Sequence, residues 1–301
     1  MFRSFKEVEQ HVLGKGIKKC IVLCGAHYEP ALEAVVNAKR QEIVSAILIG
    51  DETGVKDILA KLKEDAVGYE IINEPDEVES ANMAIRMVRE GKADIPMKGL
   101  MQSSSYLRAV LNKETGILPE GKILNQCTVF EYPDQNRLMF AGDCAMIITP
   151  TMEEKIQIIK NSVELAKCFG IKDVKVAVLS ALEKVNPKIA STVEADELSK
   201  MDWEDLCTVE GPFALDNAVD LEAAKHKGIT GKVAGNADIL AMSNLDMGNV
   251  FTKALTFFAH LKTGSALCGT QYPVIFTSRT DTPDGKYNSI LTAIMQSIHG
   301  R

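Results

Sequence analysis

The chain has 301 residues, of which 46% are hydrophobic and 25% are charged, as is usual for a globular protein. Because a single hydrophobic core stops growing at about 250–300 residues, the length predicts two domains. The 41 acidic and 34 basic side chains give a formal net charge of -7. This charge argues against a nucleic-acid-binding protein, and it means that an anionic ligand must be bound by a local cluster of donors.

The sequence lacks the usual marks of export, membrane insertion and metal binding. Its first residues contain no apolar stretch typical of a secretory signal, and no apolar run approaches the roughly 18 residues of a membrane helix. The seven cysteines are scattered without a C-x-x-C pair, and the five histidines show no metal-like spacing with them. We therefore expect a cytoplasmic protein with reduced thiols, without a metal site and without membrane or nucleic-acid partners.

The first part of the chain alternates between short apolar runs, which predict strands, and amphipathic patterns, which predict helices. In chain order the expected elements are a strand at 20–24, a helix at 30–40, strands at 46–50 and 69–73, a helix at 76–90, a strand at 93–97 and a helix at 106–111. Continuous apolar strands separated by helices are typical of a parallel sheet covered on both faces. The pattern predicts an α/β fold.

The middle of the chain predicts an antiparallel hairpin, because the runs 127–132 and 137–142 flank the turn sequence Pro-Asp-Gln-Asn. Capping boxes are expected to open two helices, one from Thr151 to Gly170 and one from Ser191 towards Met201. Further strands are expected at 175–182, 207–210, 238–242 and 274–278, and further helices at 220–227, 248–262 and 286–297. The hairpin is a plausible place for one α/β unit to give way to another.

Common catalytic motifs are absent from the sequence. The segment 228–233 has the wrong spacing for a phosphate-binding loop and lacks its hydroxyl, and Gly14-Lys15-Gly16 precedes a strand rather than a helix. No G-x-S-x-G nucleophile elbow occurs. These observations weigh against kinases, dinucleotide-binding dehydrogenases and serine hydrolases.

Ligands of open α/β sheets bind beyond the carboxyl ends of the strands, and two strand exits offer groups suited to an anion. Lys98 and Gly99 follow the strand at 93–97, and Ser103 leads three serines before a helix. These amides and hydroxyls could bind an anion, although serine capping and a solvated lysine explain them equally well.

The second exit follows the strand expected at 274–278. It contains Ser278, Arg279, Asp281 and Asp284. Arginine is suited to bidentate phosphate contact, and a neighbouring aspartate can orient it or act as a base. The alternative is that Asp281 or Asp284 only caps the last helix.

Two further exits carry polar pairs. Asp216 and Asn217 follow Gly211-Pro212 after the strand at 207–210, and Gly248 and Asn249 follow the strand at 238–242. The glycine allows a ligand to approach the backbone, and an asparagine both donates and accepts hydrogen bonds. Turn formation and helix capping are the alternative explanations for both pairs.

Taken in order, these segments form a pattern that resembles the phosphate acetyltransferase/phosphate butyryltransferase family, and its butyryl branch most closely. The likeness runs from about Ala93 to the end of the chain. It is carried by Met97-Lys98-Gly99, Leu107 to Leu111, Ala177 to Lys188, Ser191 to Ala195, Glu210 to Ala218, Val233 to Leu240, Asp246 to Asn249 and Thr277 to Asp281.

The resemblance implies a two-domain α/β fold like that of isocitrate and isopropylmalate dehydrogenases, with the site in an interdomain cleft. The first domain would comprise residues 1–141 and 280–301, and the second residues 142–279. The implied reaction is the reversible transfer of a short acyl group between coenzyme A and inorganic phosphate, giving acyl phosphate and free CoA, with a place in butyrate metabolism. CoA would be a substrate or product rather than a tightly bound cofactor, and the protein would be a homodimer.

By the same resemblance, Ser278 would hydrogen-bond the reacting group and Arg279 would hold phosphate, while Asp281 and Asp284 both stand near the place of the family's catalytic aspartate. Arg108 could be a second anion contact, but it also fits an ordinary exposed helix residue. The alternatives are a phosphate acetyltransferase, a non-catalytic acyl-CoA-binding regulator, or a dehydrogenase of the same fold, which would need clustered metal-binding aspartates that the sequence does not offer.

Overall fold

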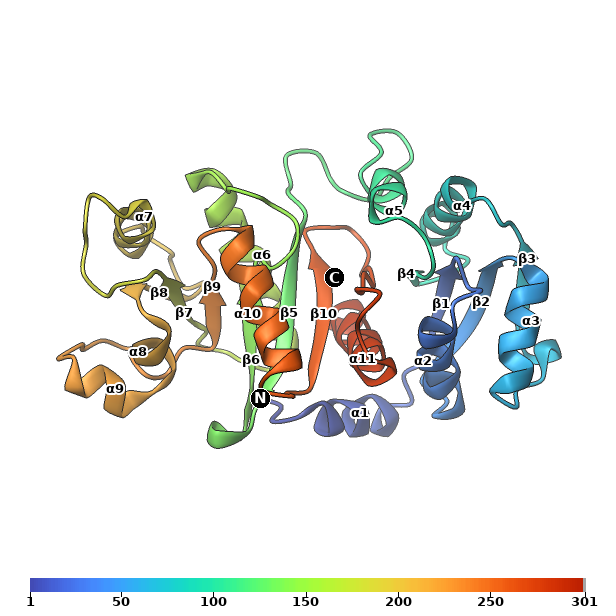
Figure 1. The fold of residues 1–301 in the computed structure, drawn as a ribbon, viewed down its shortest axis with the longest axis horizontal. Coiled ribbons are helices and arrows are strands. Elements are labelled where there is room, and N and C mark those ends of the chain that lie inside the picture. Colours follow the sequence, from blue (N-terminus) through green and yellow to red (C-terminus); the bar gives the residue numbers. More distant parts are fainter. Residues whose placement is uncertain (300–301) are drawn as a thin grey trace. The chain divides into compact units, whose positions relative to one another are not determined.

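A computed structural model describes residues 1–299 and divides them into two compact units (Figure 1). The N-terminal unit comprises residues 5–122 and 264–299, and the central unit comprises residues 1–4 and 123–263. The sequence placed the changes of domain at 141/142 and 279/280, whereas the compact units change at 122/123 and 263/264. The earlier change has a physical reason, because both strands of the expected hairpin belong to one ladder in the central unit. Residues 300–301 of the expected first domain lie outside the described residues.

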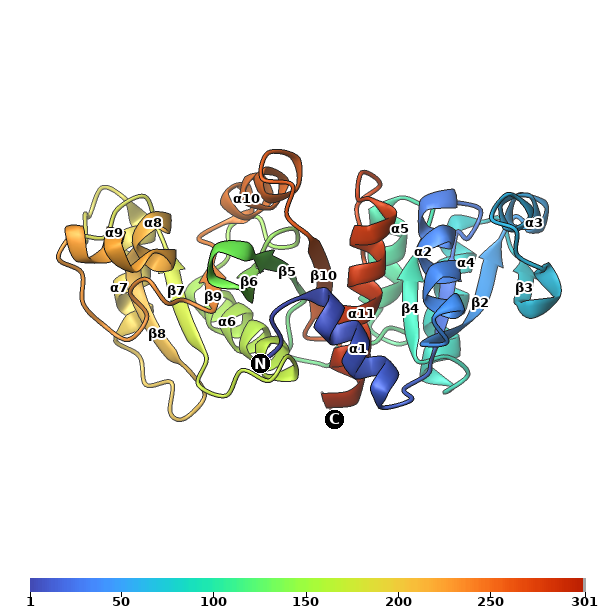
Figure 2. The ribbon, with the colours of Figure 1, turned by 90° about the horizontal axis from the view of Figure 1, so that it is seen from below.

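The N-terminal unit is built on a parallel sheet with the strand order β3-β2-β1-β4. Its strands are β1 (Lys19–Cys24), β2 (Val44–Gly50), β3 (Glu70–Asn73) and β4 (Ile95–Lys98). Its helices are α1 (Phe5–Gly14), α2 (Glu29–Arg40), α3 (Glu52–Lys61), α4 (Glu77–Arg89), α5 (Ser103–Val110) and α11 (Pro283–His299), with a 3₁₀ turn at Ala66–Gly68. Val22, Leu23 and Leu48 are fully buried in this sheet. Figure 2 shows α2 and α11 side by side, and the two helices pack together.

The central unit contains a mixed sheet whose strands follow the order β5-β6-β9-β7-β8. Its elements are β5 (Asn125–Tyr132), a 3₁₀ turn at Pro133–Gln135, β6 (Arg137–Gly142), α6 (Met152–Cys168), β7 (Lys175–Leu179), α7 (Ala190–Ser199), β8 (Thr208–Phe213), α8 (Leu215–Val219), α9 (Leu221–His226), β9 (Ile239–Ala241) and α10 (Leu245–Phe257). β5 and β6 are antiparallel, and the other pairs are parallel. Phe130, Leu179 and Phe213 belong to one buried apolar cluster. β10 (Thr263–Cys268) begins where the units change.

The α/β fold, the hairpin and the capping box of α6 are confirmed. Thr151 Oγ1 accepts the amide of Glu154 at 3.3 Å, and a carboxylate oxygen of Glu154 accepts the amide of Thr151 at 2.8 Å. The second capping box is wrong, because α7 begins after Ile189 without a side-chain cap. Ser191 instead forms a hydrogen bond with Ser180 at 2.8 Å.

Several element boundaries also differ from the expectation. The strand expected at 274–278 is reduced to bridges at Val274 and Ile275, of which Ile275 pairs in parallel with Met97 beside β4. α10 and α11 begin three residues earlier than expected, and α1, α3, α8 and β10 were not anticipated. Gly211 and Pro212 lie inside β8 rather than in a turn after it.

A buried ion pair joins the strands of the central unit. Arg137 Nη1 lies 3.1 Å from Asp238 Oδ1, and Asp238 Oδ2 accepts the amide of Lys175 at 2.9 Å. Burial raises the pKa of the Asp238 carboxyl, although the Lys175 amide and Arg137 act against this rise. The pair therefore depends on both partners, since removing one leaves a charge that neither water nor a counterion compensates.

Replacing Arg137 by Leu should lower the free energy of unfolding by about 3–5 kcal/mol, because the Asp238 carboxylate is left buried and unpaired. Chemical denaturation at neutral pH measures this loss. The double variant Arg137→Leu/Asp238→Leu should recover most of the stability, because no uncompensated charge remains. A double variant as unstable as the single one would show that packing, not charge, explains the loss.

Candidate active site

The Ser278–Arg279 loop follows a short segment that extends the parallel sheet of the N-terminal unit. The Lys98 amide donates to the carbonyl of Ile275 at 3.0 Å, so the segment runs beside β4 and the loop emerges at the carboxyl end of the strands. Ser278 and Arg279 are exposed. Within residues 1–299 the guanidinium of Arg279 has no hydrogen bond or salt bridge, which leaves its fork of donors available to a ligand.

Hydrogen bonds within the loop fix its local shape. The amide of Ser278 donates to Asp281 Oδ2 at 2.7 Å, and the amide of Asp281 donates to the carbonyl of Ser278 at 3.2 Å. The hydroxyls of Ser278 and Thr280 lie 3.0 Å apart. The Asp281 carboxylate is therefore already hydrogen-bonded within the loop. Asp284 is exposed in the first turn of α11, and its carboxylate has no hydrogen bond within the described residues.

Lys98 is the last residue of β4 and is only 3% exposed. Its ammonium lies 5.7 Å from the centre of the Phe276 ring, and no hydrogen bond or salt bridge reaches it from residues 1–299. Burial lowers the pKa of Lys98, and the positive charge of Arg279 lowers it further. Two cations that repel each other at one strand end favour binding of an anion, which would relieve that repulsion.

The start of α5 is arranged differently from the open anion site expected there. The amide of Gln102 donates to Glu77 Oε2 at 2.9 Å, and the hydroxyl of Ser105 lies 3.5 Å from the same oxygen. The Glu77 carboxylate therefore already occupies the amino end of α5, where an anionic ligand was expected. Ser103 and Arg108 are exposed on α5, and a ligand role for them stays a prediction.

Asp216 and Asn217 lie in α8 of the central unit. Both carboxylate oxygens of Asp216 approach Lys227 Nζ, at 3.0 and 2.9 Å, and this lysine lowers the pKa of Asp216. Glu183 lies 3.4 Å from the same ammonium. Asn217 is fully buried, and its side-chain oxygen has no hydrogen-bond partner within residues 1–299. The expected polar pair is therefore part of a charged cluster at the edge of the central unit's sheet.

Gly248 and Asn249 lie in the first turns of α10, after the cap formed by Asn244, whose Oδ1 accepts the amide of Met247 at 2.9 Å. A Cβ at position 248 would lie 2.3 Å from the carbonyl oxygen of Asp143. The glycine is therefore required by close packing of the helix on the backbone of this unit. Asn249 is exposed, and its role in ligand binding stays a prediction.

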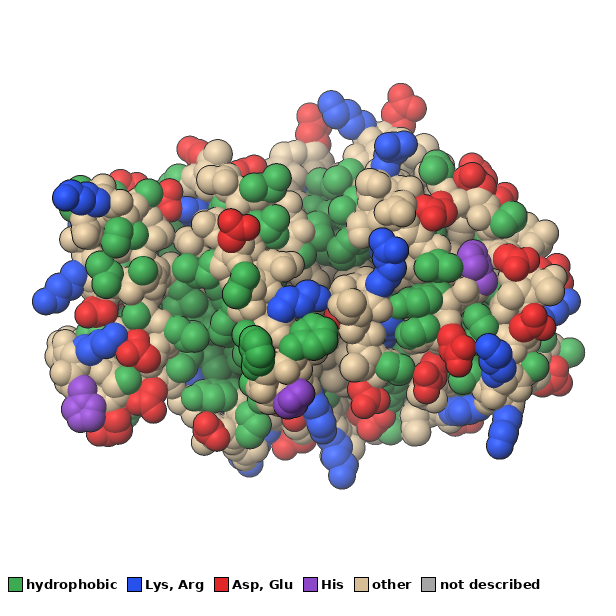
Figure 3. Space-filling view, viewed as in Figure 1, with side chains coloured by type: hydrophobic (Ala, Val, Ile, Leu, Met, Phe, Trp, Pro, Cys, Tyr) green, Lys and Arg blue, Asp and Glu red, His purple; other side chains and the backbone are tan. Residues whose placement is uncertain are grey.

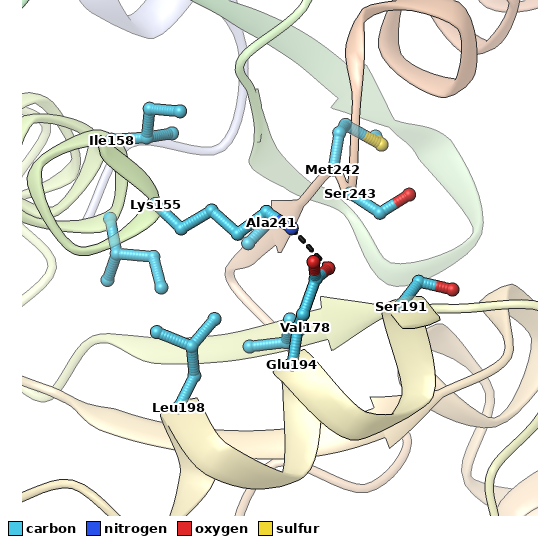
Figure 4. A pocket seen from close by; sticks show the side chains of 10 residues that line it. Lys155, Ile158, Val178, Ser191, Glu194, Leu198, Ala241, Met242 and Ser243 are labelled. Atoms are coloured by element: carbon cyan, nitrogen blue, oxygen red, sulfur yellow. Dashed lines mark hydrogen bonds and ion pairs between the residues drawn. The ribbon is translucent and has the colours of Figure 1, made fainter. Parts of the chain in front are cut away.

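A small pocket lies at the carboxyl ends of β7 and β9 in the central unit (Figure 4). Lys155 of α6 and Glu194 of α7 form an ion pair across it. Its wall is mainly apolar and includes Ile158, Val178 and Leu198. No sequence pattern indicates this pair, because Glu194 has the spacing of a local helix cap and Lys155 lies 39 positions away in another helix.

Among residues 1–299, no three His, Cys, Asp or Glu side chains are grouped so that they could hold a metal ion. None of the helices in this range is both long enough and apolar enough to cross a membrane.

Comparison with known proteins places this site in a family. Residues 52–294 match the family described as phosphate acetyl/butaryl transferase. The chain belongs to this family. All of the site residues expected from the sequence lie inside the matched range, from Lys98 to Asp284.

Members of the phosphate acetyl/butaryl transferase family resemble the chain over nearly its whole length. It is 45% identical over 298 residues to a phosphate butyryltransferase of Clostridium acetobutylicum, with 98% of each chain covered. It is 37% identical over 281 residues to a phosphate acetyltransferase of Thermotoga maritima, which covers 92% of this chain and 95% of the relative. The crystal structure of a branched-chain phosphotransacylase from Enterococcus faecalis is similar with a TM-score of 0.85 and 31% identity, covering 93% of this chain and 99% of that one.

Proposed function

We propose that this acyltransferase moves a short acyl group reversibly between coenzyme A and inorganic phosphate, with butyryl-CoA as a preferred substrate. The observation that carries the proposal is a pair of cations at a strand end. The exposed guanidinium of Arg279 has no hydrogen bond or salt bridge within residues 1–299, and its charge acts on the buried ammonium of Lys98. The chain that carries this pair is 45% identical to a phosphate butyryltransferase. An acidic protein needs such a local cluster of cations to bind phosphate.

In the proposed reaction an oxygen of hydrogen phosphate attacks the thioester carbonyl and the carbon–sulfur bond breaks. CoA leaves with its sulfur electron pair, and the proton that phosphate gives up passes through the Asp284 carboxyl to the CoA sulfur. Arg279 and Lys98 hold phosphate, and the Ser278 hydroxyl donates to the carbonyl oxygen as negative charge develops there. Asp284 accepts the thiol proton in the reverse direction, since Asp281 Oδ2 is occupied by the Ser278 amide.

The remaining expectations stay predictions beside this proposal. They include the binding of substrate by Ser103, Arg108, Asp216, Asn217, Gly248 and Asn249, an isocitrate dehydrogenase-like arrangement with an interdomain cleft, the domain limits, and a cytoplasmic location. CoA is proposed as a substrate and not as a bound cofactor.

A homodimer also stays a prediction, and exposed apolar residues on the central unit support it. Val250, Phe257 and Phe258 are 69%, 54% and 86% exposed. Figure 3 shows hydrophobic side chains gathered around α10. Large exposed apolar residues in one region favour an interaction surface.

Incubating the protein with butyryl-CoA and phosphate should release free thiol, and omission of phosphate should abolish the release. We expect kcat/KM for butyryl-CoA to exceed that for acetyl-CoA by about tenfold or more, because each methylene in an apolar pocket is worth about 1–3 kcal/mol. Higher kcat/KM with acetyl-CoA would favour the phosphate acetyltransferase alternative. Acyl-CoA binding without phosphate-dependent thiol release would favour a non-catalytic regulator.

A further inference from the structure

Two side chains from distant parts of the sequence hold consecutive carbonyl groups of the Ser278–Arg279 loop. The hydroxyl of Tyr28 donates to the carbonyl of Arg279 at 2.7 Å. The ammonium of Lys286 donates to the carbonyl of Ser278 at 2.6 Å and to Thr277 Oγ1 at 3.3 Å. The loop is thus attached to two helices, because Tyr28 immediately precedes α2 and Lys286 lies in α11.

The position of Lys286 is unfavourable for a lysine in two respects. Its side chain is fully buried, and it is the fourth residue of α11, close to the positive end of the helix dipole. An apolar side chain would stabilise a buried helix face at this position without either cost. The hydrogen bonds from the ammonium to the loop offset the cost of burying a charge at this position.

Tyr28 and Lys286 also contact each other. The ammonium of Lys286 lies 5.5 Å from the centre of the Tyr28 ring, within the range of a cation–π interaction. Since α2 and α11 pack together (Figure 2), the two side chains form one arrangement that fixes the loop against the helices. The hydrogen bonds inside the loop fix its conformation, whereas these two side chains fix its position relative to α2 and α11.

The place of the loop decides where the guanidinium of Arg279 points, because no side-chain partner within residues 1–299 holds that group. We propose that Tyr28 and Lys286 are positioning residues, which hold the backbone of Ser278 and Arg279 so that both side chains meet phosphate. This inference rests on the proposed function of the loop. It predicts that loss of either side chain weakens phosphate binding and does not cause a general loss of stability.

The test compares Tyr28→Phe with Tyr69→Phe. Each change removes one hydroxyl that makes a hydrogen bond in the N-terminal unit, since Tyr69 donates to Glu64 Oε2 at 2.9 Å. We expect Tyr28→Phe to raise KM for phosphate about three- to tenfold, the equivalent of one lost hydrogen bond, with KM for butyryl-CoA within about twofold of wild type. Tyr69→Phe should leave both KM values unchanged.

Lys286→Met should raise KM for phosphate further and lower kcat, and Lys286→Arg, which keeps a charged donor, should restore part of the loss. Wild-type constants for phosphate in Tyr28→Phe and Lys286→Arg, or equal increases in both KM values in Tyr28→Phe, would overturn the proposal. If Lys286→Met does not fold, Tyr28→Phe and Lys286→Arg still test the positioning role.

A second measurement separates this inference from the proposed function. Inorganic phosphate should raise the Tm of the wild-type protein, because a ligand of the folded state stabilises it. The shift should be smaller in Tyr28→Phe than in Tyr69→Phe at equal phosphate concentration. If phosphate shifts Tm in this order but the wild-type protein releases no thiol, the proposed reaction is contradicted and the positioning role stands. Equal shifts in the two variants would contradict the positioning role even if the enzyme is active.

Discussion

Replacing Arg279 by Ala should lower kcat/KM for phosphate by about 10²–10³-fold, the usual cost of removing one charged or polar donor from a transition state. The guanidinium is exposed and unpaired within the described residues, so its loss should leave the fold unchanged. Lys98, buried beside it, cannot take over the bidentate contact, because an ammonium lacks the planar fork. Initial rates of thiol release at varied phosphate and saturating butyryl-CoA measure the effect.

Two further variants show which property of Arg279 matters. Arg279→Lys keeps the charge and loses the fork, so it should fall between wild type and Arg279→Ala. Arg86→Ala removes an exposed arginine from α4 and serves as the matched control, with wild-type constants expected. An Arg279→Ala enzyme with wild-type KM and kcat for phosphate would remove this residue from the site.

The sequence could predict the loop but not its supports. The loop was found because Ser278 and Arg279 stand directly after a buried apolar run and match a family pattern. Tyr28 could not be connected with it, since the hydrogen bond to Arg279 joins residues 251 positions apart. Lys286 follows Pro283 in an amphipathic pattern, where a lysine normally indicates a solvated face.

Local signals were misleading where a tertiary contact used the same side chain. Glu194 has the spacing of a capping box, but its carboxylate pairs with Lys155 of another helix. The serines that begin α5 have the composition of an anion site, but Glu77 approaches the helix start from α4. In both cases an ion or hydrogen-bond partner from far along the chain replaced the local one, and no periodicity in the sequence reports such a partner.

Replacing Asp284 by Asn should lower kcat by about 10²–10⁴-fold, the usual contribution of a general base. The variant keeps the size of the side chain and loses only the ability to accept the thiol proton. The loss should be similar in both directions of the reaction, because both pass through the same transition state. Thiol release from butyryl-CoA and thiol consumption with butyryl phosphate measure the two directions.

The pH dependence of this variant distinguishes a base from a structural carboxylate. As the pH approaches about 8.5, the usual pKa of a thiol, CoA ionises without help. The deficit of Asp284→Asn in thiol consumption should therefore shrink between pH 6.5 and 9. Asp281→Asn is the matched control, because an asparagine oxygen can still accept the Ser278 amide and its deficit should not vary with pH. If the deficit of Asp281→Asn shrinks with pH and that of Asp284→Asn does not, the two aspartates exchange roles, since only the base is made dispensable by a pre-ionised thiol.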